Sequence, residues 1–142
     1  MSAALNFHYN VDPDDFARAG ETSSAVKKNL SQLGFSPDTV RRIAIAMYEG
    51  EINMVIHANG GTIDVLVEPE KIEIVMKDTG PGIPDVEKAM QEGYSTASDN
   101  VRELGFGAGM GLPNMKKYSD EMYIDTIVGK GTTLKLIIYP KG

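Results

Sequence analysis

Apolar and polar residues alternate along five short segments of the chain, and this two-residue period is typical of half-buried strands. The segments cover residues 5–11, 62–68, 72–77, 121–127 and 132–139. A tight connection at Pro69-Glu70 joins the second segment to the third, and Val128-Gly129-Lys130-Gly131 joins the fourth to the fifth. Each of these two pairs is therefore predicted to form an antiparallel hairpin.

Two longer segments carry apolar residues at three- and four-residue steps, which is the spacing of an amphipathic helix. We expect the first helix to begin with Asp12 as N-cap and Pro13 at its first position, and to end before Gly34. Its apolar stripe consists of Phe16, Ala19, Ser23, Val26, Leu30 and Leu33. A second helix is expected from Ser36-Pro37-Asp38 to about Ala58, with the stripe Val40, Ile43, Ala44, Met47 and Met54.

Shorter helices are expected at residues 84–91 and after Gly109-Met110-Gly111, where the helix ends near Tyr118. The segment at residues 93–108 is rich in glycine and lacks an apolar stripe, which suggests a lid. The order of elements predicts a two-layer α/β (α+β) sandwich, in which helices cover one face of a mixed, largely antiparallel sheet. At 142 residues, the chain is expected to form a single domain over 1–142.

Composition and charge narrow the classes of function. A net charge of −6 and a pI near 4.9 argue against binding to nucleic acids, which attract basic surfaces. The sequence contains no cysteine, which excludes disulfides and thiolate metal sites. No apolar run reaches the ~20 residues of a membrane span, so we expect no membrane association and a cytoplasmic location. An acidic chain that binds a polyanion needs a local device, such as the N–H groups of a helix start or a metal ion.

The second predicted helix carries a line of polar residues beside its apolar stripe. Glu49, Asn53 and His57 follow one another at four-residue steps and therefore share one face. A carboxylate one turn from a carboxamide suits a general base beside a ligand for Mg²⁺, which prefers oxygen donors. The same line is compatible with an ordinary solvent-exposed helix face. His57 is interpreted as a structural residue at the helix end.

Asp78 follows the third predicted strand and precedes Thr79-Gly80-Pro81-Gly82, which cannot continue a strand. A carboxylate at this point can accept a hydrogen bond from an exocyclic amine, and the glycines allow a flat ring to approach the backbone. Taken alone, the motif is also compatible with a simple turn between strands. The segment Gly109-Met110-Gly111 adds a second feature, because the backbone N–H groups of a glycine-rich helix start bind phosphate without a basic side chain.

Four segments in this order resemble the nucleotide-binding motifs of the GHKL (histidine kinase-like) ATPase superfamily. The polar line of the second helix, Glu49-x3-Asn53-x3-His57-Ala58, resembles the N box. Three glycine motifs resemble the three glycine boxes in order: Asp78-x-Gly80-x-Gly82, Gly107-x-Gly109-x-Gly111 and Gly129-x-Gly131-Thr132-Thr133. Within the superfamily, the chain is similar to the bacterial anti-sigma factors and switch-protein serine kinases. Residues 78–96 match that branch, and the 142 residues hold no dimerisation helix with a phosphoacceptor histidine. The insert at 97–104 departs from the shortest family pattern.

The resemblance implies a site for ATP or ADP with Mg²⁺. Asp78 would accept a hydrogen bond from the adenine amino group, Gly82 would lie beneath the base and Thr132 would support its far edge. Asn53 would hold the Mg²⁺ that bridges the phosphates, and Glu49 would orient and deprotonate the attacking hydroxyl. The other nucleotide-binding residues implied are Gly80, Ile83, Gly107, Gly109, Met110, Gly111 and Leu112, with Arg102 as a candidate contact to the γ-phosphate.

Three functions are compatible with these residues. The first is an ATP-dependent protein serine/threonine kinase of a partner-switching system, which phosphorylates a serine of a STAS-domain, anti-anti-sigma-like partner. The second is a nucleotide-gated module that sequesters a sigma factor or another regulator without catalysis. The third is an ATPase component of a larger assembly. Glu49 favours the kinase, because binding alone requires no base. A homodimer is compatible with each of the three.

Overall fold

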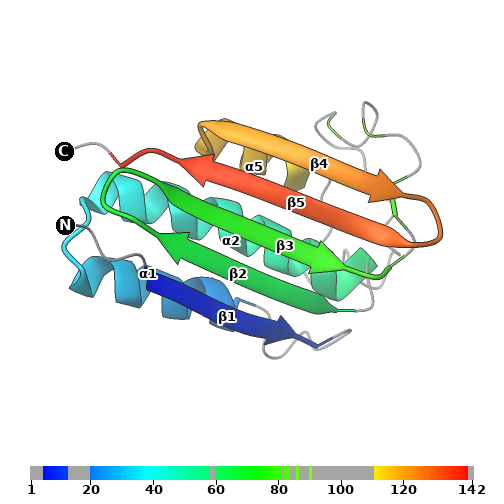
Figure 1. Cartoon of the computed structure of the whole chain (residues 1–142), viewed down its shortest axis with the longest axis horizontal. Coiled ribbons are helices and arrows are strands. Elements are labelled where there is room, and N and C mark those ends of the chain that lie inside the picture. Colours follow the sequence, from blue (N-terminus) through cyan, green and yellow to red (C-terminus); the bar gives the residue numbers. More distant parts are fainter. Residues whose placement is uncertain are drawn as a thin grey trace, which may run out of the picture.

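The computed structural model describes residues 5–12, 20–57, 60–80, 82–83, 86, 90 and 111–140. Within these residues, five strands form one sheet in the order β1-β2-β3-β5-β4 (Figure 1). The strands are β1 (Leu5–Val11), β2 (Gly61–Val67), β3 (Ile72–Asp78), β4 (Glu121–Ile127) and β5 (Gly131–Ile138). Both predicted hairpins are confirmed, since β2 pairs antiparallel with β3 and β4 pairs antiparallel with β5.

The pairing of the described strands is antiparallel throughout, which confirms the largely antiparallel sheet and corrects only the expectation of a parallel pair within it. β3 and β4 run in the same direction and would form a parallel pair if they were neighbours. β5 lies between them and pairs antiparallel with both, so no parallel pair arises among these strands. β1 and β4 are the two edges of the described sheet.

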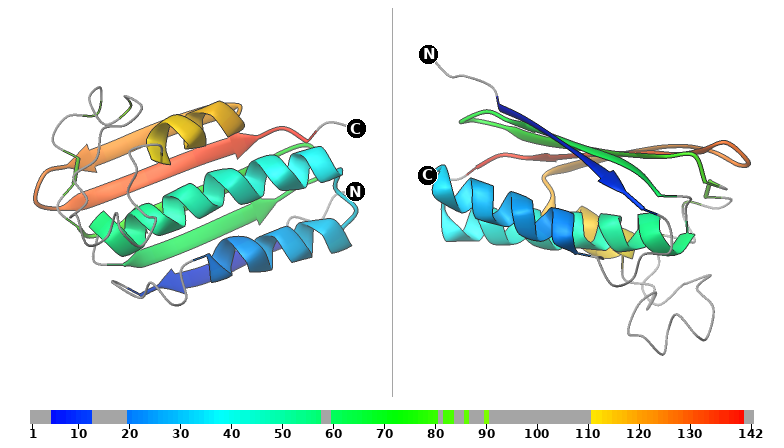
Figure 2. Two further views of the ribbon diagram at one scale, coloured as in Figure 1. Left: turned by 180° about the vertical axis from the view of Figure 1, so that it is seen from behind. Right: turned by 90° about the horizontal axis from the view of Figure 1, so that it is seen from below.

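Three helices in the described part of the chain cover one face of this sheet (Figure 2). They are α1 (Glu21–Gln32), α2 (Pro37–His57) and α5 (Gly111–Tyr118). α2 lies between the other two and packs on β3. The predicted two-layer sandwich is therefore confirmed, together with the limits of α2 and the end of α5. No helix among the described residues combines the length and the apolar character that crossing a membrane requires.

The helix expected at 84–91 falls mostly outside the described residues. Its two described members are Val86 and Met90, and the Met90 N–H donates to the Val86 carbonyl at 3.0 Å. This spacing of four residues is that of one helical hydrogen bond. The predicted lid at 93–108 lies entirely outside the described residues.

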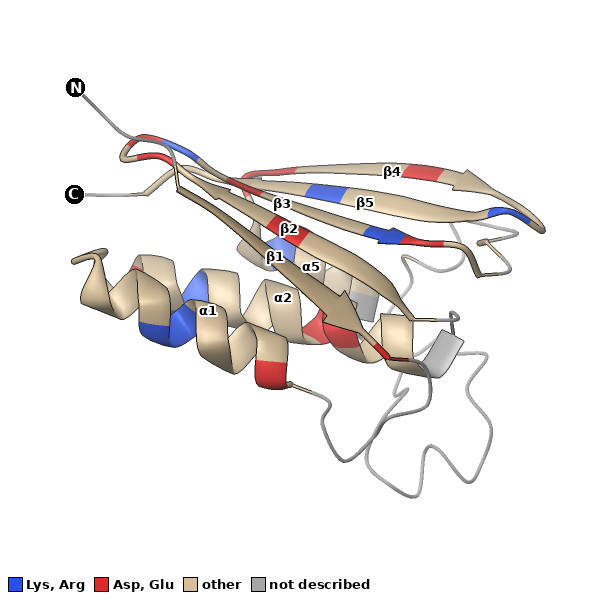
Figure 3. Cartoon of the chain, turned by 60° about the horizontal axis from the view of Figure 1, so that its bottom comes forward, with Lys and Arg blue, Asp and Glu red and all other residues tan. Residues whose placement is uncertain are grey.

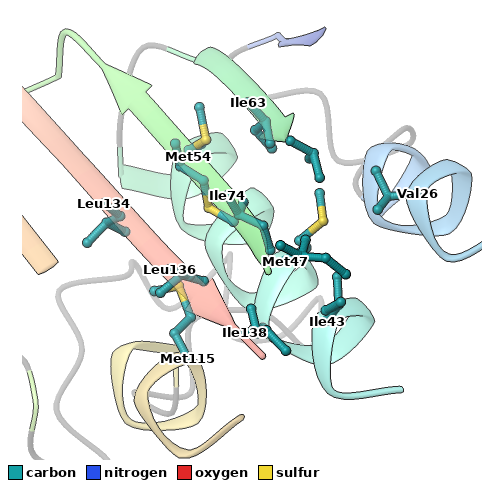
Figure 4. Packing of buried hydrophobic residues seen from close by; sticks show 14 of the residues in the cluster. Val26, Ile43, Met47, Met54, Ile63, Ile74, Met115, Leu134, Leu136 and Ile138 are labelled. Carbon is teal, nitrogen blue, oxygen red and sulfur yellow. The ribbon is translucent and has the colours of Figure 1, made fainter. Parts of the chain in front are cut away.

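The hydrophobic core lies between α2 and the helix-facing side of the sheet (Figure 4). Of the predicted stripe on α2, Ala44 is half-buried, and Ala46 is fully buried instead. The other stripe residues are buried as predicted: Val40, Ile43, Met47 and Met54. Alternate residues of the strands meet them from the sheet, because successive side chains of a strand point to opposite faces. Examples are Ile63, Ile74 and Leu136.

The end of α1 agrees with the prediction that Gly34 terminates it. Gly34 (φ 91°) donates its N–H to the Ser31 carbonyl at 3.2 Å, and Phe35 donates to the Leu30 carbonyl at 3.3 Å. These two bonds form a Schellman motif, which needs the left-handed conformation that glycine adopts without strain. Phe35 packs against the core. Leu33, predicted to belong to the apolar stripe, is instead 47% exposed, because it lies beyond the last helical residue.

The start of α1 differs from the predicted N-cap at Asp12. The helix begins at Glu21, and its N-cap is Gly20, whose φ of 96° is in the left-handed region. Residues 13–19, where the prediction placed the first two turns, lie outside the described part of the chain. Gly20 has no side chain with which to cap the helix, so the N–H groups of the first turn need another acceptor.

The acceptor for the first turn of α1 is the side chain of Glu51 on α2, which is 3% exposed. Its carboxylate accepts hydrogen bonds from the backbone N–H groups of Gly20 (3.0 Å), Thr22 (3.2 Å) and Ser23 (3.0 Å). A carboxylate is also favoured at this position because the N-terminal end of a helix carries partial positive charge. The start of α1 is thus set by a neighbouring helix and not by its own sequence.

Candidate functional site

The described residues that are expected to lie around the adenine base come together where β3 ends and β5 begins. Asp78, the last residue of β3, lies opposite Thr132 in the register of the two strands. Gly61, the first residue of β2, lies close to both Asp78 and α2. A Cβ built on Gly61 would lie 3.1 Å from Asp78 Cα and 2.7 Å from Cε of Met54 on α2. Met54 directly follows Asn53 on α2. The polar line of α2 and the end of β3 therefore meet at the same end of the sandwich.

Two hydrogen bonds fix the orientation of the Asp78 side chain. Its Oδ1 accepts from the backbone N–H of Gly80 at 2.9 Å and from that of Thr132 at 3.3 Å. The side chain is half-buried, and none of the described residues donates a hydrogen bond to Oδ2. One oxygen thus holds the following loop and the neighbouring strand, while the other can accept a hydrogen bond from a ligand. This geometry fits an acceptor for an exocyclic amino group.

Thr126 on β4 joins the loop after Asp78 to the β4–β5 hairpin. Its Oγ1 accepts from the Ile83 N–H at 2.8 Å and lies 2.8 Å from the hydroxyl oxygen of Thr132, which is 6% exposed. The loop approaches the hairpin so closely that a Cβ on Gly82 would lie 2.6 Å from the Ile127 carbonyl oxygen. Gly82, Ile83 and Thr132 are therefore brought together, although their contacts with an adenine base stay predictions.

The two acidic residues in the C-terminal half of α2 have different neighbours (red in Figure 3). Glu51 binds α1, whereas Glu49 is half-buried and accepts a hydrogen bond from the side chain of Asn114 on α5. Burial raises the pKa of the Glu49 carboxyl above its usual value of 4.5, and the hydrogen bond from Asn114 opposes this rise. A carboxylate whose pKa is raised in this way is a stronger proton acceptor near neutral pH than an exposed one.

Asn53 lies one helical turn beyond Glu49 and is also half-buried, so this part of α2 is not an ordinary exposed face. Its carboxamide oxygen is of the donor type that Mg²⁺ prefers. Mg²⁺ commonly binds only one or two protein oxygens and takes its other ligands from phosphate and water. The residues present therefore fit a metal ion that is shared with substrate phosphates. Among the described residues, no group of three or more His, Cys, Asp or Glu side chains could hold a metal ion.

The predicted phosphate-binding segment is described only from Gly111, where α5 begins. The side chain of Leu112 is 7% exposed and belongs to the core, so any contact of Leu112 with phosphate would involve its backbone. The predictions that concern residues outside the described part are those for Gly107, Gly109, Met110, Arg102 and the side chain of His57.

Sequence reasoning missed three residues that organise this region, namely Glu51, Thr126 and Asn114. The hairpin pattern carried a signal for Thr126, because Thr126 and Thr132 flank the turn and face each other in the β4–β5 register. Asn114 had a weaker signal, as a polar residue in the first turn of α5 between the buried Leu112 and Met115. Glu51 had none, since an acidic residue in a helix is usually exposed.

The comparisons with known proteins identify the family of the chain. The model of the histidine kinase-like ATPase domain matches residues 13–138. The serine/threonine-protein kinase RsbT of Bacillus subtilis is 33% identical over 110 residues, which are 75% of this chain and 77% of that protein. The anti-sigma F factor of Thermoanaerobacter sp. (strain X514) is 31% identical over 140 residues, which are 95% of this chain and 91% of that protein.

Two solved structures resemble the fold. The first contains the RsbU and RsbW domains of a Mycobacterium tuberculosis protein and matches with a TM-score of 0.65 at 15% identity, covering 97% of this chain and 33% of that chain. The second, the mycobacterial sensor histidine kinase MprB, matches with a TM-score of 0.54 at 16% identity, over 96% of this chain and 99% of that chain. At such identities these matches indicate the fold alone. The family match and the sequence relatives indicate more: the chain belongs to the histidine kinase-like ATPase family, among relatives that include the RsbT kinase and the anti-sigma F factors.

Proposed function

We propose that this chain is an ATP-dependent protein serine/threonine kinase that phosphorylates a serine of a STAS-domain partner in a bacterial partner-switching system. The observation that carries the proposal is the environment of Glu49, which is half-buried, hydrogen-bonded to Asn114 and one turn from Asn53. A domain that only bound nucleotide would need no such base. The name of the relative RsbT, a serine/threonine-protein kinase, supports the same class of activity.

The reaction assigns a separate task to each of three side chains. Asp78, through Oδ2, would accept a hydrogen bond from the adenine amino group of ATP and so select the base. Asn53 would bind Mg²⁺, which when present neutralises and aligns the phosphates. Glu49 would take the proton of the serine hydroxyl while the serine oxygen bonds to the γ-phosphorus. The bond from that phosphorus to the bridging oxygen breaks, and ADP leaves with the bonding electrons.

The test is incubation of the purified chain with γ-labelled ATP, Mg²⁺ and a STAS-domain protein of the same organism. Label on a serine of the partner is the expected result. Release of free phosphate without labelling of the partner would contradict the proposal and favour an ATPase component of an assembly.

A second candidate function is a nucleotide-gated module that sequesters a sigma factor. The observation that favours it is the match to anti-sigma F factors along 95% of this chain, which is longer than the match to RsbT. The same incubation distinguishes it when a sigma factor is added to a parallel sample. Binding of the sigma factor that depends on ATP, without labelling of the STAS protein, would support this function over the kinase.

Replacing Asp78 by Asn is expected to weaken ATP binding about five- to more than hundredfold. The two N–H groups that bind Oδ1 would hold the amide oxygen of Asn in its place, so the amide NH₂ takes the position of Oδ2. A donor then faces the adenine amino group, and an unpaired buried contact costs about 1–3 kcal/mol. Calorimetric titration with Mg-ATP measures the effect. Binding as tight as that of the parent would show that Asp78 does not contact the base.

A further inference from the structure

At the residue that follows Glu49, α2 packs closely on β3 and also contacts α5. Gly50 is buried, and a Cβ built on it would lie 2.1 Å from Met76 Sδ on β3 and 3.2 Å from Met115 Sδ on α5. A larger residue would clash with Met76 and crowd Met115, so Gly50 allows α2 to pack closely on both β3 and α5. Met115 is 0% exposed and anchors this side of α5 in the core.

This packing sets which residue of α5 faces the carboxylate. Leu112 and Met115 lie on one side of α5, three residues apart, and both are buried. Asn114 directly precedes Met115 on α5, and Glu49 directly precedes Gly50 on α2. The side chain of Asn114 is half-buried and is hydrogen-bonded to Glu49. Because an ionised carboxylate can only accept, the Asn114 amide NH₂ is the donor.

We propose that Asn114 is a positioning residue for the phosphoryl transfer, which holds the carboxylate of Glu49 and connects it to the first turn of α5. The inference rests on the proposed kinase function, in which Glu49 is the base. The hydrogen bond occupies one acceptor site of the carboxylate and restricts its rotation, so the other oxygen keeps one direction for the serine hydroxyl. α5 begins at Gly111, the last glycine of the second glycine motif, so Asn114 links the carboxylate of Glu49 to the helix that starts at this motif.

The hydrogen bond also stabilises the ionised form of Glu49, in which the carboxylate can accept a proton. Within the described part of the chain, burial and Asn114 are the two influences on the pKa of Glu49, and they act in opposite directions. The rate of transfer should therefore rise with pH as Glu49 loses its proton, at a pH above the usual carboxyl value of 4.5. Loss of Asn114 leaves burial unopposed and moves this rise to higher pH.

The first test is Asn114→Ala, with Lys116→Ala as the control, because Lys116 is an exposed residue of the same helix. The carboxyl signal of Glu49, followed by NMR through a pH titration of the nucleotide-free protein, should titrate at higher pH in Asn114→Ala and at the parent pH in Lys116→Ala. This readout needs no kinase activity. An unchanged titration in Asn114→Ala would overturn the role of Asn114, whether or not the chain is a kinase.

The second test asks whether Asn114 acts through Glu49. At pH 7 Asn114→Ala should lower single-turnover transfer roughly two- to tenfold, the value of one hydrogen bond, with no change in ATP affinity. In a Glu49→Gln background the same substitution should have no further effect, because the group that it positions no longer accepts a proton. An equal loss in both backgrounds would show a general structural role and would overturn the proposal. Absence of transfer by the parent would instead refute the kinase function, and the NMR titration would then decide the role of Asn114.

Discussion

Glu49→Ala is expected to slow the transfer of phosphate from ATP to the partner serine by about 10²–10⁴-fold, the usual cost of losing a general base. Nucleotide affinity should be unchanged, because the substitution leaves both proposed nucleotide contacts in place. These are Asp78, which is assigned to the adenine ring, and Asn53, which is assigned to the metal ion. The measurements are single-turnover phosphorylation of a partner serine and calorimetric titration with Mg-ATP on the same protein preparation.

Two further variants separate chemistry from binding. Glu49→Gln has a similar size and can still accept a hydrogen bond from Asn114, but it takes up no proton, so it should be about as slow as Glu49→Ala. Asn53→Ala should lose both transfer and nucleotide affinity, because the triphosphate is then neither neutralised nor aligned. If both residues merely formed a helix surface, each substitution would change stability by no more than ~0.5 kcal/mol and spare transfer. Transfer at the parent rate by Glu49→Ala would refute the kinase and favour the nucleotide-gated module.

The parts of the fold that sequence predicted are those whose determinants are local. The strands could be predicted because the alternation of apolar and polar residues along each strand depends only on which face of the strand is buried. The start of α2 was visible because its cap is local: the Thr39 N–H donates to the Ser36 hydroxyl oxygen at 3.3 Å, and Pro37 occupies the first helical position. The start of α1 was missed because its cap is the side chain of Glu51, which lies 31 residues from Gly20 in the chain.

The candidate site divides in the same way. Glu49 and Asn53 could be paired from helical spacing, and Asp78 could be placed from the strand that precedes it, because each relation lies within one element. Thr126 and Asn114 act between elements that are distant in the sequence. The Thr126 contact with Ile83 spans 43 residues, and the Asn114 contact with Glu49 depends on the packing of α5 against α2. The sequence predicted a largely antiparallel sheet but not the lack of any parallel pair among the described strands, since nothing local indicates that β5 inserts between β3 and β4.

Glu51 is the residue through which α2, the helix that carries Glu49 and Asn53, holds α1. Its buried carboxylate accepts hydrogen bonds from three backbone N–H groups of the α1 start, and Gly20 provides no substitute. Water cannot readily replace the carboxylate at a site where Glu51 is 3% exposed, so truncation leaves buried donors without an acceptor. The loss is larger than that of an ordinary helix cap, because a cap side chain usually satisfies one such group.

Glu51→Ala is therefore expected to lower the free energy of unfolding by about 2–4 kcal/mol, a large share of the total for a domain of this size. Glu51→Gln should cost less, because its amide oxygen still accepts while its NH₂ group opposes one of the N–H donors. The control is Glu70→Ala, which removes the same charge from an exposed position and should change stability by less than ~0.5 kcal/mol. Urea unfolding measures the free energy of unfolding of all three variants. The comparison is made with the same slope of that free energy against urea concentration for each variant. If Glu51→Ala unfolds at the same urea concentration as Glu70→Ala, the carboxylate does not hold the start of α1, and that helix must be stabilised by its packing on α2 alone.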